Sequence, residues 1–410
     1  MKNIKRPEVL SPAGDFEKLQ AALRFGADAV YLAGKSFGMR AASDNFSVEE
    51  LKSAAELVHS YGKKIYLTLN TMPHASEYPA LRHFLGEIKN IGIDAVIVAD
   101  LGVLATVRSL LPDMEIHIST QASICSPEAA VEYAKMGASR LVLARELTLP
   151  EIRAIRSALP DRVELEAFVH GAMCVSYSGR CMFSNQLTGF DANRGECKQP
   201  CRWSYTLLEV KRPDLPIPIE ENEHGTFIMS SRDMCAIELI PELIDAGVNS
   251  FKIEGRVKSA YYTAVVTNAY KMAVDAYMRD PDGYSFDPAL MTELESVSHR
   301  EYCKGFYLYS PTENANLCAQ SGYIREKAYL AIADEDAKAG QMCRFIQRNK
   351  FFSGDSVELV SPGKLGRAMK IEDLRGAEGE SLESAPHPGM TFYARAPFDI
   401  CKYDIIRAGS

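Results

Sequence analysis

Hydrophobic and polar positions repeat as one unit over residues 7–256. A short apolar run rich in β-branched residues is followed by a small or polar residue and then by a segment with helical apolar spacing. The runs predict buried strands, and the spacing predicts amphipathic helices. Eight strands are expected, at Val9–Ser11, Ala29–Ala33, Lys64–Leu69, Ala95–Ala99, Glu115–Ser119, Arg140–Ala144, Glu164–Val169 and Ser250–Glu254.

A helix is expected in each unit. Ser47 and the pair Ser126-Pro127 are typical helix starts, and glycines such as Gly62 and Gly92 are typical helix ends. Eight alternating βα units predict a parallel (β/α)8 TIM-like barrel with its helices outside. A doubly wound open sheet is the alternative, because closure cannot be seen in a sequence. The helices are expected at about residues 15–25, 48–61, 79–91, 101–111, 127–136, 150–158, 237–246 and 259–279.

Polar side chains gather where the predicted strands end. In a (β/α)8 barrel these positions face one mouth, which is where such enzymes place their chemistry. Asn70 and Gln121 are candidate ligand-binding residues there, and His170 is either a proton-transfer residue or a structural histidine. Lys252, Glu254 and Arg256 alternate with a period of two, so they point to one face. An inward set of charges predicts a functional clamp for a carboxylate or a phosphate, with Lys252, Glu254 and Arg256 as catalytic candidates.

The hydropathy pattern changes along the rest of the chain. Residues 1–280 form the predicted barrel domain, whose segment 171–249 is an insertion between strands seven and eight, and 281–321 form a connecting segment. Residues 322–410 alternate in short strands with turn signals, which predicts a small antiparallel β-barrel domain. Residues 325–410 hold 13 basic and 13 acidic residues, so the negative charge lies on the barrel.

Composition narrows the class of protein. Apolar residues make up 47% of the 410 residues and charged residues 24%, as in an ordinary globular protein. The N-terminus has no signal-peptide pattern and no apolar stretch is long enough to span a bilayer, so a cytoplasmic protein is expected. The net charge of −8 argues against a generally basic nucleic-acid coat, although a local basic patch would suffice to bind RNA.

Five of the ten cysteines fall within 62 residues of the insertion: Cys174, Cys181, Cys197, Cys201 and Cys235. Gly, Asn, Arg and Ser surround them rather than the periodic apolar residues expected around buried thiols. Thiolates are the preferred ligands of soft metals and of iron–sulfur clusters. An iron–sulfur cluster is therefore favoured, with zinc, core packing and disulfides as alternatives.

Basic and aromatic residues accompany these cysteines. Arg180, Arg194, Lys198 and Arg202 lie near Trp203, the single tryptophan. Cations beside an aromatic ring suit RNA, through phosphate contacts and base stacking. Equally, these arginines are suited to donate hydrogen bonds to a cluster. Tyr261 is a further candidate for base stacking, and helix packing accounts for it equally well.

Three segments together resemble the collagenase-like peptidase family (U-thirty-two): LSPAGDFEKLQAALRFGADAVYLAGKSFGMRA, FVHGAMCVSYSGRCMFSNQLTGFDANRGECKQPCRWSY and FKIEGRVKSAYY. The resemblance covers nearly the whole chain. Within the family, the length and motifs are most similar to a bacterial group implicated in forming 5-hydroxyuridine at the tRNA wobble position. That resemblance implies tRNA as partner, prephenate, a dicarboxylate, as co-substrate, and a 4Fe-4S cluster as cofactor.

Cluster ligands in a quinone-pathway relative match Cys174, Cys181, Cys197 and Cys235, so the resemblance implies these as the metal ligands, with Cys201 as a possible substitute. Two other functions compete with tRNA hydroxylation. One is a peptidase, which the family name suggests, although no nucleophile–base pair is recognisable in the sequence. The other is an RNA-binding scaffold stabilised by zinc or a cluster.

Overall fold

The computed structural model describes residues 4–39, 44–174, 176–203, 208–209, 212–216, 231–314, 316, 318 and 323–409. Within these residues the chain divides into two compact units, and each is described by itself. Unit 1 comprises residues 1–19, 28–257 and 299–323, and unit 2 comprises residues 20–27, 258–298 and 324–410. No helix in the described ranges is long and apolar enough to cross a membrane.

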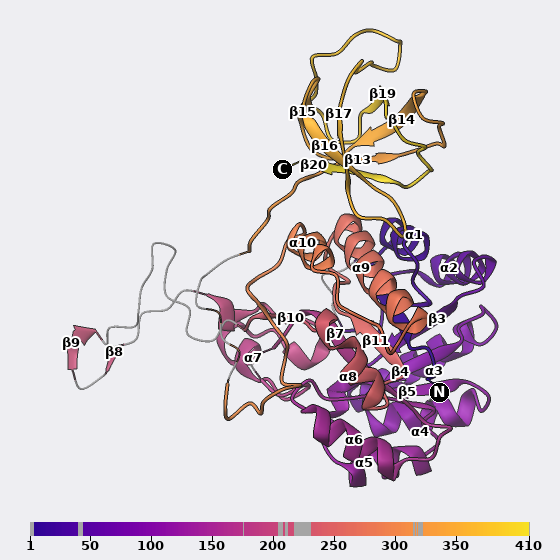
Figure 1. The fold of residues 1–410 in the computed structure, drawn as a ribbon. Helices are drawn as coiled ribbons and strands as arrows, with labels where there is room; N and C mark the ends of the chain where they lie inside the picture. The colour runs from indigo at the N-terminus through magenta and orange to yellow at the C-terminus, as the bar shows by residue number, and fades with distance from the viewer. Residues whose placement is uncertain are drawn as a thin grey trace. The chain divides into compact units, whose positions relative to one another are not determined.

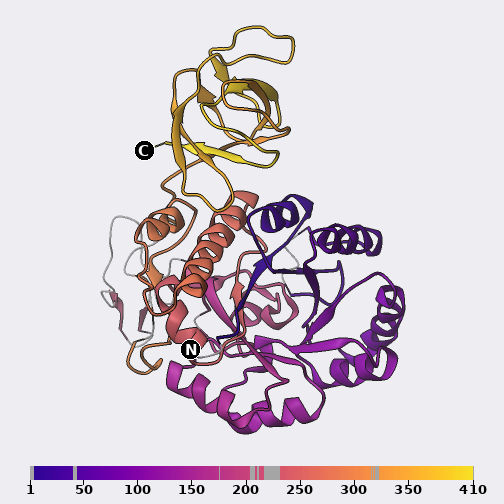
Figure 2. The same cartoon turned by 45° about the vertical axis from the view of Figure 1, so that its right-hand side comes forward.

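Unit 1 is built on a closed barrel of eight parallel strands, as the sequence predicts. Each strand pairs with the next in chain order, and the last one, β11, pairs with both β7 and β1. Figures 1 and 2 show the strands surrounded by helices. The barrel strands are β1 (Glu8–Pro12), β2 (Ala29–Ala33), β3 (Lys64–Leu69), β4 (Ala95–Val98), β5 (Glu115–Ile118), β6 (Arg140–Val142), β7 (Glu164–Ala172) and β11 (Ser250–Ile253).

The helices that follow the first seven barrel strands begin and end within three residues of their predicted positions. Local signals account for this agreement. The Ser47 side chain accepts a hydrogen bond from the backbone of Glu50, and Ser126 caps the helix that begins at Pro127 by accepting from the backbone of Ala129. Gly26, Gly62 and Gly92 have positive φ where helices stop. These helices are α1 (Phe16–Arg24), α2 (Val48–Ser60), α3 (Tyr78–Ile88), α4 (Leu101–Leu110), α5 (Pro127–Lys135), α6 (Leu149–Ala158) and α8 (Ile240–Asp245).

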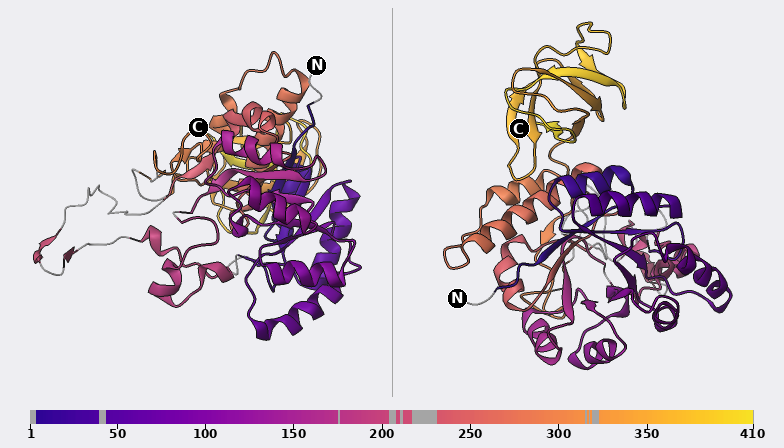
Figure 3. Two further views of the ribbon diagram at one scale, coloured as in Figure 1. Left: turned by 90° about the horizontal axis from the view of Figure 1, so that it is seen from below. Right: turned by 90° about the vertical axis from the view of Figure 1, so that its right-hand side faces the viewer.

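The excursion between β7 and β11 carries its own elements. It contains helix α7 (Phe183–Thr188), the two-stranded β8 (Leu208–Glu209) and β9 (Arg212–Pro216), and strand β10 (Asp233–Cys235). Strand β10 runs antiparallel to β7 and also pairs with β12 (Tyr302–Cys303). Helix α7 lies outside the ring of barrel helices (Figure 3). The excursion therefore leaves the barrel at β7 and returns beside the same strand.

Unit 2 combines two helices with the C-terminal sheet. The helices are α9 (Ala260–Arg279) and α10 (Ala289–Glu295). The predicted antiparallel β-structure is confirmed as a six-stranded half-barrel sheet in the order β17-β16-β20-β13-β14-β19. The strands of this region are β13 (Tyr329–Ala333), β14 (Met342–Gln347), β15 (Phe351–Phe352), β16 (Ser356–Val360), β17 (Arg367–Lys370), β18 (Ser384–Ala385), β19 (Thr391–Arg395) and β20 (Ile405–Ala408).

A buried ionic network links the helices of unit 2 to its sheet. The guanidinium of Arg407 on β20 donates to both carboxylate oxygens of Glu293 on α10, at 2.7 and 2.8 Å. Its Nε donates to Glu358 on β16 at 2.7 Å, and the arginine side chain is only 2% exposed. Glu358 also pairs with Lys327 at 2.6 Å, but Arg407 is the cation that joins it to Glu293, so Arg407 stabilises the contact between α10 and the sheet.

Candidate functional site

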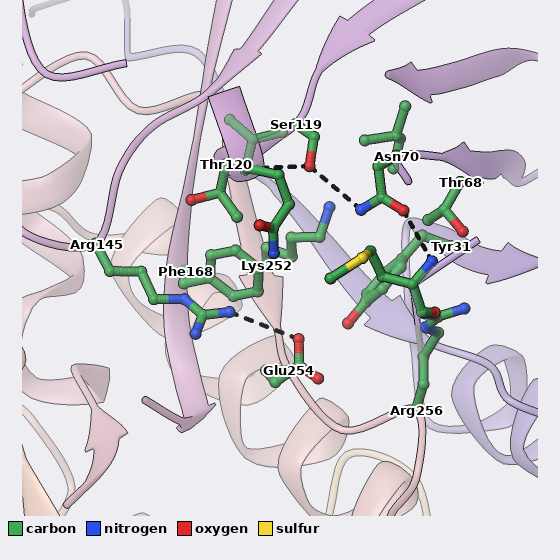
Figure 4. Close-up of a pocket in the computed structure, with 14 residues that line it drawn as sticks. Tyr31, Thr68, Asn70, Ser119, Thr120, Arg145, Phe168, Lys252, Glu254 and Arg256 are labelled. Atoms are coloured by element: carbon green, nitrogen blue, oxygen red, sulfur yellow. Dashed lines mark hydrogen bonds and ion pairs between the residues drawn. The ribbon is translucent and has the colours of Figure 1, made fainter. Parts of the chain in front are cut away.

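A small polar cavity lies at the carboxyl ends of the barrel strands (Figure 4). Its volume is about 50 Å³. Of the six strand-end residues predicted to bind a ligand or to react, five line this cavity and His170 does not. The five are Asn70, Gln121, Lys252, Glu254 and Arg256. The remaining lining residues are Tyr31, Met39, Thr68, Ile97, Ser119, Thr120, Val142, Arg145 and Phe168.

Lys252 is held at the base of the cavity by charge and by aromatic rings. Its ammonium donates to Glu166 Oε1 at 2.7 Å and lies 4.4 Å from the centre of the Tyr31 ring. The side chains of Lys252 and Glu166 are 5% and 0% exposed. Burial by itself would raise the pKa of Glu166, but the charges of Lys252 and Arg140 outweigh burial and lower that pKa. The ion pair therefore places a fixed positive charge in the cavity.

A second ionic layer supports this pair from within the barrel. Arg140 on β6 contacts Glu166 at 3.2 Å and also pairs with Glu8 and Glu164, each at 2.7 Å. Tyr66 donates its hydroxyl hydrogen to Glu8 at 2.7 Å. Because every carboxylate in this layer has a cationic partner, the network holds Glu166 and, through it, Lys252 in one position.

Two arginines reach the cavity along with Glu254. Arg145, which follows β6, lies 4.0 Å from the centre of the Phe168 ring and 3.7 Å from Glu254 Oε2. Arg145 also donates to the carbonyl of Ala172 at 3.1 Å, and Arg256 donates to the carbonyl of Met39. The side chains of both arginines are well buried, and Figure 4 shows them reaching the cavity from different strands. The cavity thus contains three cations and one carboxylate, a combination that favours an anionic ligand.

Asn70 and Gln121 form the neutral wall of the cavity. Asn70 Oδ1 accepts from the backbone of Met39 at 3.1 Å, and its Nδ2 donates to Ser119 Oγ at 3.3 Å. The Ser119 hydroxyl also accepts from the backbone nitrogen of Gln121. These bonds connect the loops after β2, β3 and β5. Both residues therefore line the cavity at the barrel mouth.

His170 does not line the cavity. The pairing of β7 with β11 shifts after Lys252, so that Lys252 is opposite Phe168 whereas Ile253 is opposite His170. This bulge inserts one extra residue in β7 and breaks the inward–outward alternation of its side chains. His170 is 1% exposed and lies beside Tyr302, whose hydroxyl is 3.4 Å from His170 Nε2.

The predicted RNA- or cluster-binding residues are distributed over three places. Arg180 is exposed on the excursion. Arg194 pairs with Glu77 at 2.7 and 2.9 Å and lines a second cavity of about 430 Å³. Tyr261 belongs to unit 2, where it is 4% exposed and its hydroxyl lies 2.9 Å from Ser296 Oγ. Its burial agrees with the helix-packing alternative and leaves no free ring face for a base.

Four of the five clustered cysteines are close in space. Burial raises the pKa of Cys201, Arg202 lowers it, and the nearby thiols of Cys174, Cys197 and Cys181 raise it further. The backbone nitrogen of Gln199 donates to Cys197 Sγ at 3.4 Å. Cys235 lies on β10, opposite His170 in the pairing with β7.

Among the described residues, no group of three or more His, Cys, Asp and Glu side chains has a geometry that would hold a metal ion. The donor set nevertheless fits a soft metal centre, because thiols gathered in one segment and an N–H···S bond to one of them suit thiolate ligation. The residues that would hold such a centre are the cysteines of the excursion.

Comparison with known proteins places the chain in a family. Residues 14–317 match Peptidase family U32, and residues 325–407 match the Peptidase family U32 C-terminal domain. The chain belongs to peptidase family U32. The resemblance noted in the sequence is thereby confirmed, and the C-terminal match begins within three residues of the predicted boundary at 322.

Three relatives illustrate the range of names within this family. The chain is 36% identical to "tRNA hydroxylation protein P1" of Bacillus subtilis, covering 94% of this chain and 90% of that protein. It is 41% identical to the "23S rRNA 5-hydroxycytidine C2501 synthase" of Escherichia coli, covering 67% of this chain and 40% of that protein. It is 31% identical to a "Collagenase" of Porphyromonas gingivalis, covering 93% of each chain.

Several residues of the site have no clear sequence signal. Tyr31 and Met39 reach the cavity from an apolar strand and from a loop, whereas Arg145 directly follows the predicted strand Arg140–Ala144 and shares the strand-end signal of Asn70 and Gln121. Glu166 was detectable, because a charged residue in the middle of an apolar strand requires a buried partner. Its spacing from Phe168 and Glu164 follows the inward face of β7.

Proposed function

We propose that the chain is a tRNA-modifying enzyme that hydroxylates the wobble uridine to 5-hydroxyuridine, with prephenate as co-substrate and a 4Fe-4S cluster as cofactor. The observation that carries this proposal is the convergence of Arg145, Lys252 and Arg256 on a small cavity at the barrel mouth. Similarity over 94% of the chain to a protein named for tRNA hydroxylation supports RNA as the substrate.

The cavity suits the carboxylates of a small dicarboxylate. Arginine offers a planar fork of donors to a carboxylate, and Lys252 adds a charge that Glu166 keeps in place. Glu254, which already contacts Arg145 at 3.7 Å, limits the net charge and can accept a hydrogen bond from a ligand hydroxyl. Because these groups are pre-arranged by the barrel, they bind and orient the ligand without a large rearrangement.

The cysteines would hold the cluster close to this mouth. Cys174, Cys181 and Cys197 would be ligands, with Cys235 as the fourth or Cys201 in its place. When bound, the cluster would supply electron transfer or a coordination site for a substrate oxygen. Arg202 lies next to these thiols, and it would offset part of the negative charge of a thiolate-bound centre.

Peptidase activity is the second candidate, favoured by the collagenase relative at 31% identity. The cavity gives it little support. No histidine or cysteine is among the residues that line it, and the hydroxyl of Ser119 accepts hydrogen bonds from Asn70 and Gln121. A serine nucleophile needs a base within hydrogen-bond reach.

The proposal is tested by nucleoside analysis of tRNA from cells that lack the host's own hydroxylation activity and express this chain. We expect 5-hydroxyuridine from the natural chain and a loss of at least tenfold in the variant Arg145→Gln. The matched control is Arg153→Gln, because Arg153 on α6 forms an exposed ion pair with Asp245 on α8. Equal levels in all three strains, or none in any, would contradict the proposed reaction.

The cluster is tested separately by anaerobic purification with iron and sulfide analysis and an absorption spectrum. We expect stoichiometric iron and sulfide that are lost in Cys181→Ser and retained in Cys401→Ser, whose exposed thiol lies in unit 2. Zinc, or no metal, would contradict the cluster and favour the scaffold. Gelatin cleavage that persists in Cys181→Ser would favour the peptidase.

A further inference from the structure

The excursion exposes aromatic rings near its cysteines. Tyr177, Phe190 and Trp203 are 52%, 44% and 45% exposed, and all three lie within residues 176–203. Phe190 lies just after α7, and Trp203 lies just after the turn at Pro200–Arg202. This helix and this turn contact each other. Large exposed rings concentrated in so short a segment are typical of a binding surface rather than of ordinary solvent-facing structure.

Cations accompany these rings. Lys198 Nζ lies 4.0 Å from the centre of the Phe190 ring, and Arg202 donates to the hydroxyl of Tyr323, another exposed ring, at 3.3 Å. Residues 174–203 contain four basic residues (Arg180, Arg194, Lys198 and Arg202) and two acidic ones (Asp191 and Glu196). This segment therefore carries a local charge of +2 in a chain whose net charge is −8. Such a contrast favours the approach of a polyanion to this segment.

The same segment is fastened to the loops of the barrel mouth. Arg194 donates to Glu77 in the loop after β3, and Ser178 donates its backbone hydrogen to Glu146 Oε1, after β6, at 3.2 Å. Gly179 packs so closely on the backbone oxygen of Gln121 that a β-carbon would overlap it. A ligand bound to the exposed rings is therefore held next to the mouth of the barrel.

We propose that residues 176–203, here called the aromatic segment, form a binding surface for single-stranded RNA. Exposed rings stack on the faces of unpaired bases, while lysine and arginine contact the phosphates. A duplex hides its base faces, so an unpaired loop is the favoured partner. The inference rests on the proposed function, because it names the surface that presents an RNA loop to the barrel mouth.

The single tryptophan provides a direct test. Trp203 is the only source of tryptophan fluorescence in the chain, so a base that stacks on it will quench the whole signal. The full chain is titrated with an RNA hairpin that has an unpaired loop and with a blunt RNA duplex of equal length. We expect the hairpin to quench the fluorescence over the concentration range in which it binds, and the duplex to leave it unchanged.

Variants then separate stacking from charge. Phe190→Leu keeps an apolar side chain but removes the ring, and we expect hairpin affinity to fall about tenfold. Lys198→Gln should reduce the slope of log affinity against log salt by about 0.7, the value for one phosphate contact on a single strand. The matched control is Phe352→Leu, because Phe352 in unit 2 is 51% exposed and has Lys350 4.8 Å from its ring centre. Its affinity should stay unchanged.

The outcomes distinguish this surface from the proposed reaction. Hairpin binding without quenching, or equal losses in Phe190→Leu and Phe352→Leu, would overturn the surface even if hydroxyuridine still forms. Quenching and ring-dependent binding would support the surface even if the natural chain forms no hydroxyuridine. Circular dichroism and thermal unfolding of each variant exclude misfolding as the cause of a lost affinity.

Discussion

Lys252 and Glu166 show how much the candidate site depends on one buried pair. Their atoms are 2.7 Å apart, and neither side chain has appreciable contact with solvent. A buried ion pair adds little stability compared with an apolar pair, but removal of one partner leaves the other charge without compensation. We therefore infer that this pair fixes the Lys252 ammonium at the barrel mouth rather than adding stability.

The variant Glu166→Gln should be strongly destabilised. It leaves both Lys252 and Arg140 short of one buried carboxylate charge, and we expect the free energy of unfolding to fall by about 3–5 kcal/mol. Denaturant unfolding at pH 7 measures this change. Glu132→Gln is the control, since Glu132 pairs with Lys135 on the surface and both are more than half exposed. A loss in Glu166→Gln no larger than in the control would refute the role of the pair.

The same carboxylates predict how stability depends on pH. Burial alone would raise the pKa of Glu164, but Lys5 and Arg140 lower it to about 2, and the pKa of Glu166 is lowered as well. The stabilisation is complete above the ordinary value of 4.5 and is lost as the pH falls from there towards 2. The free energy of unfolding should therefore decrease over that range, and less steeply in Glu166→Gln. Parallel curves for the two proteins would contradict this.

At the scale of single residues, the sequence predicts those site residues that interrupt a pattern. Lys252, Glu254 and Arg256 are detectable because charges alternate at a strand end, and the cavity contains all three. Arg145 is not distinguishable from any arginine that begins a βα loop. His170, for which the sequence leaves a structural role open beside proton transfer, is buried away from the cavity beyond a bulge, and a single strand's pattern does not record such a bulge in the pairing of distant segments.

Among the elements, β7 and its neighbours control the shape of the mouth. Gly171 has φ +104°, and a β-carbon there would overlap the backbone oxygen of Glu254. Glycine is thus required both by the backbone conformation at this position and by the close approach of the segment that contains Glu254. This approach sets the position of Glu254 relative to Arg145.

The variant Gly171→Ala should lose more stability than backbone strain alone accounts for. We expect a destabilisation of about 1–3 kcal/mol together with a reduced yield of hydroxyuridine, since Glu254 must shift. Gly62→Ala is the matched control, because Gly62 has φ +67° but open space around its β-carbon position. Thermal unfolding and tRNA nucleoside analysis provide the two measurements. Equal effects at both positions would show that the contact with Glu254 is unimportant.

Element boundaries are predicted well where local signals exist. Strands β2 and β3 begin and end at the predicted residues because apolar runs, caps and glycines all coincide there. Strands β10 and β12 are absent from the prediction. They are two or three residues long and are stabilised by pairing with β7 and with each other, so their sequences carry no period of their own.

On the scale of the whole molecule, contacts divide the chain differently from the sequence. The repeating pattern predicts α9 as part of the barrel domain 1–280, whereas in the structure α9 and α10 share a compact unit with the C-terminal sheet. Asn268 on α9 accepts from the backbone of Gly363 at 2.7 Å and donates to the carbonyl of Lys364 at 2.9 Å. Arg407 adds the ionic contacts to Glu293 and Glu358. A sequence pattern does not reveal such distant partners.

The variant Arg407→Met should destabilise unit 2. It leaves the buried carboxylate of Glu293 without its cation, while Glu358 keeps Lys327 at 2.6 Å, and we expect the free energy of unfolding of this unit to fall by about 3 kcal/mol. Hydrogen exchange of β16 and β20 locates the loss. Arg375→Met is the control, because Arg375 is 46% exposed and pairs with Asp373 on the surface. Unchanged exchange in Arg407→Met would contradict the importance of the network.

The pairing of β10 with β7 has a consequence for how this scaffold can change. Ala172 and Asp233 are opposite one another on adjacent antiparallel strands, so the excursion begins and ends at neighbouring points. Evolution can therefore lengthen, shorten or replace the intervening residues while the barrel still closes. An engineer can do the same, by opening new chain termini there or by transplanting the segment from a relative. The proposed RNA-binding surface can therefore be exchanged as one segment while the barrel is kept.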